Sequence, residues 1–198
     1  MRFIFVIMIV LFAFANQALA ISPINIDSIK AAHNYGKVNS QLSLEEFLQP
    51  WISYEEKAAA LSSNSEHAYL YTPFLLLATD SREKQLNGKN ATLEDSERIL
   101  SDYAGTLSLS VFLIGEDKNF NQNCTVIIKQ DKKTVKPYQV IIPIELQAVP
   151  GTPPGLFGIQ CYFYFFEKEL QMTKPIHLIV ITGDKKEHNF YFDLDKIK

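Results

Sequence analysis

The sequence predicts an α+β protein: an antiparallel, sandwich-like β domain of about six to seven strands, with two to four short helices from the N-terminal half packed on it. Strand-like runs separated by turn-rich pieces dominate residues 106–198. No helix pattern lies between those runs, whereas a doubly wound parallel sheet needs a crossover helix between its strands. Helix-start signals are instead concentrated before residue 105, so the helices are expected to form a separate layer.

The first 20 residues have the three parts of a secretory signal peptide. Arg2 is followed by an unbroken apolar run from Phe3 to Ala15, and Ala18-Leu19-Ala20 offers small residues at a cleavage site. A buried N-terminal helix is the alternative reading. Cleavage after Ala20 leaves residues 21–198 and changes the formal charge from −3 to −4. We therefore expect export to the periplasm or the extracellular space, and no membrane span in the mature chain.

The segment after the signal is polar and patternless over residues 21–42, which predicts an extended or loosely packed start. Ser43 and Glu46 then form a capping-box pattern that begins a helix. Pro50 interrupts this helix, and a second box starting at Ser53 restarts it, so residues 43–62 are expected to form one bent helix or two short ones. The expected buried face consists of Phe47, Leu48, Trp51 and Ile52.

A strand is expected over residues 67–78, with Pro73 marking a sheet edge or a bulge. Asp80 could cap a short helical turn that ends at Asn87-Gly88. Thr92 caps a further helix over 92–104, which Gly105 ends; its buried candidates are Leu93, Ile99, Leu100 and Tyr103.

The β-rich part begins at Thr106 and completes a single domain over 43–198. Its strand-like runs after the first are Cys124–Gln130, Tyr138–Ala148, Gly158–Phe166, Ile176–Thr182 and Asn189–Leu194. The last two runs flank a charged turn and predict a closing β-hairpin. Alternation places Phe190, Phe192 and Leu194 on one face, and Tyr191 and Asp193 on the other.

Two cysteines remain in the mature chain, Cys124 and Cys161. Because an exported protein can form disulfides, this pair is a candidate disulfide that would close a loop of 38 residues. The alternative is two small buried apolar residues. A catalytic pair is not expected, because the chain has no C-x-x-C motif and neither cysteine has a flanking basic residue.

The aromatic run at residues 162–166 is the strongest candidate contact surface. Alternation assigns Phe163 and Phe165 to one face and Tyr162, Tyr164 and Phe166 to the other. If the first face is core, the second must be covered by the N-terminal helices or by a partner. We expect the helices carrying Phe47 and Trp51 to cover it. The candidate patch consists of Tyr69, Tyr71, Tyr162, Tyr164 and Phe166.

Catalytic, metal and cofactor signatures are weak throughout the chain, and we assign no catalytic, metal or cofactor residue. His33 and His67 are far from the other histidines in sequence, but His177 and His188 fall near opposite positions of the hairpin, where a two-histidine site is conceivable. A solvent-facing hairpin is the simpler interpretation.

Three further patterns have ordinary explanations. Asp117, Asn119 and Asn121 imitate the start of a calcium loop, but Gln122 and Ile128 replace its essential glycine and glutamate. Glu46, Glu55 and Glu56 fit helix-start positions better than a carboxylate pair for glycoside hydrolysis. Asn90 and Asn123 lie in N-glycosylation patterns, which matter only in a eukaryotic secretory pathway.

Function is therefore predicted only by class. The mature chain is mildly acidic, has no basic cluster and keeps two arginines, Arg82 and Arg98, so nucleic acid is not expected as a partner. The first hypothesis is a non-catalytic binding or structural module of the cell envelope or extracellular space, with a protein or glycan partner. The alternative is an exported hydrolase that acts on envelope polymers and uses His177 or His188 with Asp184 or Asp193. The sequence does not determine the oligomeric state.

Overall fold

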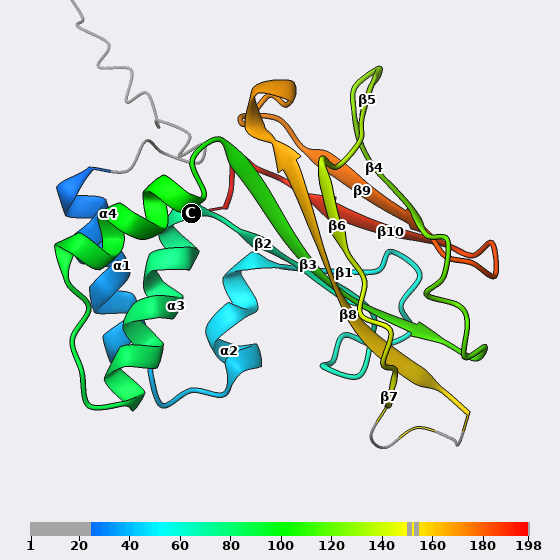
Figure 1. Cartoon of the computed structure of the whole chain (residues 1–198), viewed down its shortest axis with the longest axis horizontal. Helices are drawn as coiled ribbons and strands as arrows, with labels where there is room; N and C mark the ends of the chain where they lie inside the picture. Colours follow the sequence, from blue (N-terminus) through cyan, green and yellow to red (C-terminus); the bar gives the residue numbers. More distant parts are fainter. Residues whose placement is uncertain (1–24, 150–151, 153–154, 198) are drawn as a thin grey trace, which may run out of the picture.

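The computed structural model describes residues 25–149, 152 and 155–197. Their architecture is the predicted α+β fold with antiparallel sheets (Figure 1), in which helices gather at one end of the molecule and two sheets occupy the other. The described residues form ten strands rather than six or seven, because four of them are pieces of only two or three residues. The predicted signal peptide, residues 1–20, lies outside the described residues. Among the described residues, no helix combines the length and the hydropathy that a bilayer crossing requires.

The larger sheet carries the candidate aromatic surface. Its strands lie in the order β1-β2-β3-β8-β6, every neighbouring pair is antiparallel, and β7 pairs with the other end of β8. The bounds are β1 Ile52–Tyr54, β2 His67–Tyr71, β3 Thr106–Gly115, β6 Gln139–Ile141, β7 Gln147–Ala148 and β8 Phe157–Phe166. β3 and β8 pair along their entire ten-residue lengths, so they form the backbone of the sheet.

The smaller sheet has the order β10-β9-β4-β5. Its strands are β4 Thr125–Gln130, β5 Lys133–Val135, β9 Ile176–Ile181 and β10 Glu187–Phe192. The predicted closing hairpin is confirmed: Phe190 and Phe192 are buried, whereas Tyr191 between them is exposed. An isolated antiparallel bridge between Glu55 and Phe190 joins the two sheets along one edge.

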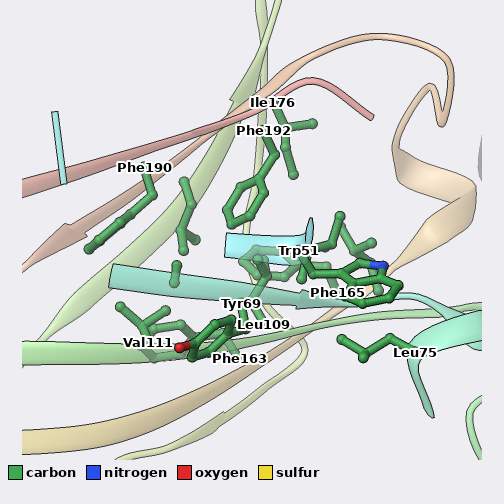
Figure 2. Close-up of a cluster of buried hydrophobic side chains, with 14 of the residues drawn as sticks. Trp51, Tyr69, Leu75, Leu109, Val111, Phe163, Phe165, Ile176, Phe190 and Phe192 are labelled. Atoms are coloured by element: carbon green, nitrogen blue, oxygen red, sulfur yellow. The ribbon is translucent and has the colours of Figure 1, made fainter. Parts of the chain in front are cut away.

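The core lies where the inward faces of both sheets meet (Figure 2). Val111, Phe163 and Phe165 project from the larger sheet, and Phe190 and Phe192 project from the smaller one. Each of these five side chains is at most 2% exposed. Burying large apolar side chains of this kind contributes roughly 1.5–3 kcal/mol each, so this layer dominates the stability of the β domain.

The N-terminal segment differs from the prediction. Residues 21–42 were expected to be extended or loosely packed, but Ile26–Val38 form helix α1, capped by the Asn25 side chain. Ala32 is fully buried, and Gly36 lets α1 approach helix α3 (Pro73–Leu86) closely, because a Cβ there would lie 2.2 Å from the carbonyl oxygen of Ala78. The prediction failed because the apolar face of α1 is short and rests on small residues.

The predicted helix at 43–62 is correct only at its beginning. Ser43 and Glu46 form the expected capping box, and Leu44–Leu48 form α2, which continues as a 3₁₀ turn over Gln49–Trp51. The second box is wrong, because Ser53 lies in β1 opposite Ala68. Backbone pairing with β2 therefore prevails over the local capping signal.

The predicted strand at 67–78 is half correct. Strand β2 ends at Tyr71, and Pro73–Leu86 form helix α3. Thr72 caps this helix by accepting a hydrogen bond from the Leu75 N–H, and Pro73 occupies its first turn, where a missing N–H costs nothing. Pro73 is thus a helix-start residue and not a sheet-edge residue.

The predicted helix at 92–104 is confirmed as α4, Leu93–Asp102. Thr92 and Asp95 form a capping box, and Asp95 also forms an ion pair with Lys84 of α3. Because of that ion pair and its hydrogen bonds to Thr92, the pKa of Asp95 is well below its ordinary value. This contact fixes α4 against α3.

The predicted disulfide is not formed, and both cysteines are free thiols. Cys161 is fully buried on the inward face of β8, and burial raises the pKa of its thiol to about 12. Cys124 precedes β4, and its Sγ instead lies 3.3 Å from the carbonyl oxygen of Asn121. The alternative reading, two small buried apolar residues, fits Cys161 better than the half-buried Cys124.

Candidate binding cleft

The outward face of the larger sheet has two columns of tyrosines separated by a column of serines. Strand pairing places Ser108 of β3 between Tyr71 of β2 and Tyr164 of β8. In the next row, Ser110 lies between Tyr69 and Tyr162. Because serine is much smaller than tyrosine, β3 forms the floor of a trough, and the phenol rings of β2 and β8 form its walls.

A cavity of about 180 Å³ occupies one end of this trough, which we call the tyrosine cleft. Helices α3 and α4 close that end, because Leu76 of α3 and Tyr103, the C-cap of α4, line the cavity. The cleft reaches the surface at Tyr162, which is 38% exposed. The full lining is Tyr71, Leu76, Tyr103, Ser108, Leu109, Tyr162 and Tyr164.

The hydroxyl of Ser108 is the unusual polar group of the tyrosine cleft. The residue is only 6% exposed, and its Oγ has no hydrogen-bond partner among the described residues. Ser110, one row away, is satisfied because its Oγ accepts a hydrogen bond from the Gln160 side chain. An unpaired buried hydroxyl costs about 1–3 kcal/mol, so the Ser108 hydroxyl is a site where a ligand or water can restore a lost interaction.

The environment of the cleft favours the neutral form of two of its tyrosines. Burial, together with the smaller effects of the neighbouring Tyr162 and Glu83, raises the pKa of Tyr71 to about 12. Burial also raises the pKa of Tyr164. None of the seven lining residues has an acidic or basic side chain, so the cleft presents aromatic rings, hydroxyl groups and two leucine side chains.

The residues of the predicted aromatic patch are divided between three environments. Tyr71, Tyr162 and Tyr164 line the tyrosine cleft. Tyr69 is buried in the neighbouring row, where burial and the nearby Glu45 of α2 raise its pKa to about 12. Phe166 is 40% exposed and stacks on Tyr138 with ring centroids 4.3 Å apart, beyond the cleft lining.

Of the four lining residues that the sequence analysis missed, two are polar. Ser108 belongs to the run Thr106-Leu-Ser-Leu-Ser110, where the alternation does signal a second, small-residue face. Tyr103 was expected to be buried on its helix, yet it is 37% exposed and lines the cleft. No local pattern shows that the end of α4 meets strands β3 and β8.

The expected cover of the patch by Phe47 and Trp51 is wrong. Trp51 instead packs edge-on against Tyr35 of α1 and stacks with Phe74 of α3, with centroids 5.5 Å and 6.1 Å away. Phe47 contacts the same Tyr35 ring. These aromatic residues thus pack among the helices at one side of the shared core, and Tyr162 and Phe166 stay exposed.

The two hairpin histidines do not come together. His177 is exposed and pairs with Tyr191, whereas His188 pairs with Val180 and is buried on the opposite face. The Nδ1 atom of His177 lies 3.6 Å from the Glu56 carboxylate at the surface. The conceivable two-histidine site is therefore not present.

His188 belongs to a buried chain of polar groups that links the sheets. Its Nδ1 lies 2.8 Å from Glu66 Oε2, and its Nε2 lies 3.1 Å from the Thr182 hydroxyl. Thr182 donates to the Asp184 carboxylate over 2.6 Å, and Glu66 Oε1 accepts from the Ile114 N–H over 2.7 Å. Since Thr182 uses its proton on Asp184, it accepts the Nε2 proton of His188.

This order of hydroxyl, imidazole and carboxylate resembles a nucleophile–base–orienter arrangement, but its geometry is that of a structural link. Thr182 is 1% exposed and His188 is 5% exposed. No substrate carbonyl can reach either group unless the hairpin opens. Asp193 does not take part in this series of hydrogen bonds, and its carboxylate forms an ion pair with Lys196.

The remaining polar residues singled out in the sequence form hydrogen bonds within their own loops or lie in exposed loops. Asp117 accepts the Asn119 N–H, and the Asn119 side chain accepts from Gln122, so these oxygens close a turn. Asn121 donates to the Pro143 carbonyl. Both sequon asparagines, Asn90 and Asn123, lie in exposed loops.

In comparisons with protein-family models, curated proteins and solved structures, no match to this chain is found. Its function must be argued from the chemistry of its own residues.

Proposed function

We propose that the mature chain is an exported, non-catalytic binding module that holds a small group of its ligand in the tyrosine cleft. The observation that carries this proposal is the unpaired Ser108 hydroxyl at the floor of an aromatic cavity. Tyrosines are favoured at binding surfaces because they provide a large, rigid contact area at a small entropic cost. A purely structural face would gain stability from filling the cavity and pairing or replacing the hydroxyl.

Export is supported by the N-terminal sequence pattern alone. Arg2, the apolar run and the Ala18-Leu19-Ala20 site have the order that a signal peptidase reads. We expect the protein recovered from a periplasmic or culture fraction to begin at Ile21. N-terminal sequencing and intact mass measure this directly, and an intact Met1 terminus in the exported fraction would contradict it.

The binding proposal is tested by ligand-induced stabilisation of the purified protein. A ligand that binds only the folded state at about 100 times its Kd stabilises it by about 2.7 kcal/mol, which a thermal melt resolves. The panel contains neutral sugars, short peptides and organic amines. At least one class should stabilise the wild type and not Ser108→Val, in which the larger side chain fills the cleft floor.

Two variants provide the controls. Tyr162→Ala removes an exposed cleft ring, and Tyr191→Ala removes a tyrosine of similar exposure, 43%, from the smaller sheet. The proposal predicts that only the first weakens stabilisation by the ligand. It fails if no class stabilises the wild type, or if Ser108→Val and Tyr162→Ala respond like the wild type.

The hydrolase alternative has one supporting observation, the contact between His188 and Glu66. The burial of His188 counts against it. Its test is hydrolysis of envelope polymers by the wild type and by His188→Gln. Activity that His188→Gln abolishes while its melting curve stays cooperative would establish the hydrolase and displace the binding proposal.

A further inference from the structure

We propose that the tyrosine cleft binds a quaternary ammonium group, such as the trimethylammonium head of choline. This inference rests on the proposed binding function and adds the chemical class of the ligand. It depends on the charge balance, the spacing of the rings, the volume of the cleft and the chemistry of the Ser108 hydroxyl.

The charge balance favours a cation over an anion. Four phenol rings line the cleft, and no lysine, arginine or histidine does. The one charged side chain that acts on Tyr71 is the carboxylate of Glu83, on the helix that closes the cleft. Aromatic ring faces are negative because of their quadrupole, so they attract a cation placed above them. An anion would find no positive partner.

The ring spacing suits a compact apolar cation. Tyr71 and Tyr164 lie in one row and are separated by the β3 strand. Two strand spacings amount to about 10 Å, which leaves room for one compact ligand group between the tyrosine side chains of β2 and β8. The ring of Tyr164 contacts that of Tyr138, 6.4 Å away on its outer side. The trough between the two columns therefore stays open.

The volume is also appropriate. A cavity of about 150 Å³ holds one benzene molecule. The tyrosine cleft, at about 180 Å³, therefore accepts a group of similar size, such as the head of choline. A hexose has about twice as many heavy atoms as benzene and would have to leave much of its ring outside.

The Ser108 hydroxyl distinguishes between kinds of cation. A primary ammonium has three N–H donors, each of which must find an acceptor to replace its lost water. A quaternary ammonium has no N–H group to leave unpaired. The Ser108 Oγ lacks any other partner among the described residues, so its lone pairs are free to face the methyl groups that carry the positive charge.

The experiment is an NMR titration of the purified full-length mature protein with choline and with 3,3-dimethylbutan-1-ol. The alcohol has the same shape, but a carbon atom replaces the charged nitrogen. Because desolvated cation–π attraction reaches about 2 kcal/mol or more, choline should bind at least about tenfold more tightly. Phosphocholine and Nε-trimethyllysine are titrated in parallel, and the tighter of the two identifies a lipid-type or a protein-type source of the group.

Three variants test the assigned site. Tyr162→Ala should weaken choline binding about tenfold, whereas Tyr162→Phe, which keeps the ring, should stay within about threefold of the wild type. Tyr191→Ala should change nothing. The amide spectrum of each variant reports whether it is folded, so a loss of binding is not confused with a loss of structure.

Each result has a definite meaning. Equal affinity for choline and its neutral analogue overturns the ammonium assignment but leaves an apolar binding cleft. Binding of a sugar or peptide without choline supports the proposed function and overturns this inference. If choline binds but Tyr162→Ala binds it as well as the wild type, the cleft is the wrong site. If no probe or panel ligand binds, both proposals fail.

Discussion

The burial and the pKa of individual residues in this molecule depend on the side chains of the neighbouring strands. His67 and Tyr69 are two positions apart on β2, so both lie on its outward face, yet both are buried. The His67 ring packs between aromatic rings, including Phe112 at 5.4 Å between centroids. Its Nδ1 donates to the Ser65 carbonyl oxygen over 2.7 Å. Burial outweighs this hydrogen bond and lowers the pKa of His67 below its ordinary value of 6.5.

The lowered pKa of His67 predicts a stability that decreases in mild acid. The unfolded chain takes up the proton first as the pH falls through 6.5, so acid favours unfolding until the folded pKa is reached. His67→Phe keeps an aromatic ring and removes the titration. Urea midpoints at pH 7.5 and pH 5.5 should therefore differ less for this variant than for the wild type. Identical pH dependence in both proteins would contradict the assignment.

At the scale of elements, helix and strand boundaries depend on which signal has tertiary support. The capping boxes at Ser43 and Ser53 look alike in sequence, but only the first begins a helix. Glu55, inside the second box, is buried where it accepts backbone hydrogen bonds from Lys57 and Asn189. The contact with β10 therefore keeps this segment extended.

Because α1 packs closely on α3, replacing a helix glycine by alanine is expected to lower stability here, whereas it usually raises it. In an ordinary helix, alanine is preferred over glycine by about 1 kcal/mol. At Gly36 a Cβ would lie 2.2 Å from the Ala78 carbonyl oxygen, so Gly36→Ala should destabilise the protein by about 2 kcal/mol.

The matched control lies on the exposed side of the same helix. Ala31→Gly should cost about 1 kcal/mol, as helix propensity requires. Both values are measured by urea denaturation. A stabilising Gly36→Ala would show that the helices can separate at no cost, and the close approach would not be a structural constraint.

At the scale of the whole molecule, the two sheets are held together by the shared apolar core and by the link at Glu66. This residue lies in the β1–β2 loop, yet it contacts His188 of the smaller sheet and the Ile114 N–H of the larger one. Its side chain is 17% exposed, so solvent screens these contacts only in part. The link therefore ties three segments that are far apart in sequence.

Removal of this link should weaken the whole fold. Glu66→Ala leaves His188 and the Ile114 N–H without their partner, and we expect a loss of about 3 kcal/mol. Glu66→Gln can still accept from Ile114 and donate to His188, so it should lose less than half as much. Glu187→Ala, at an exposed position of β10, should change stability by less than about 0.5 kcal/mol. Equal losses for the Ala and Gln variants of Glu66 would contradict a hydrogen-bonded link.

The sequence alone determined the fold class, the closing hairpin with Phe190 and Phe192 inward, and the helix beginning at Thr92. These features depend on periodicity and capping, which act between residues close in the chain. It also singled out three of the four cleft tyrosines, because strand alternation separated them from the core.

Only the tertiary structure decided that these tyrosines surround a cavity. The cleft requires β3 to lie between β2 and β8, so that Ser108 separates Tyr71 from Tyr164. It also requires the end of α4 to close one side with Tyr103. Strand order and helix docking are set by burial of the whole core, which no local window of sequence contains.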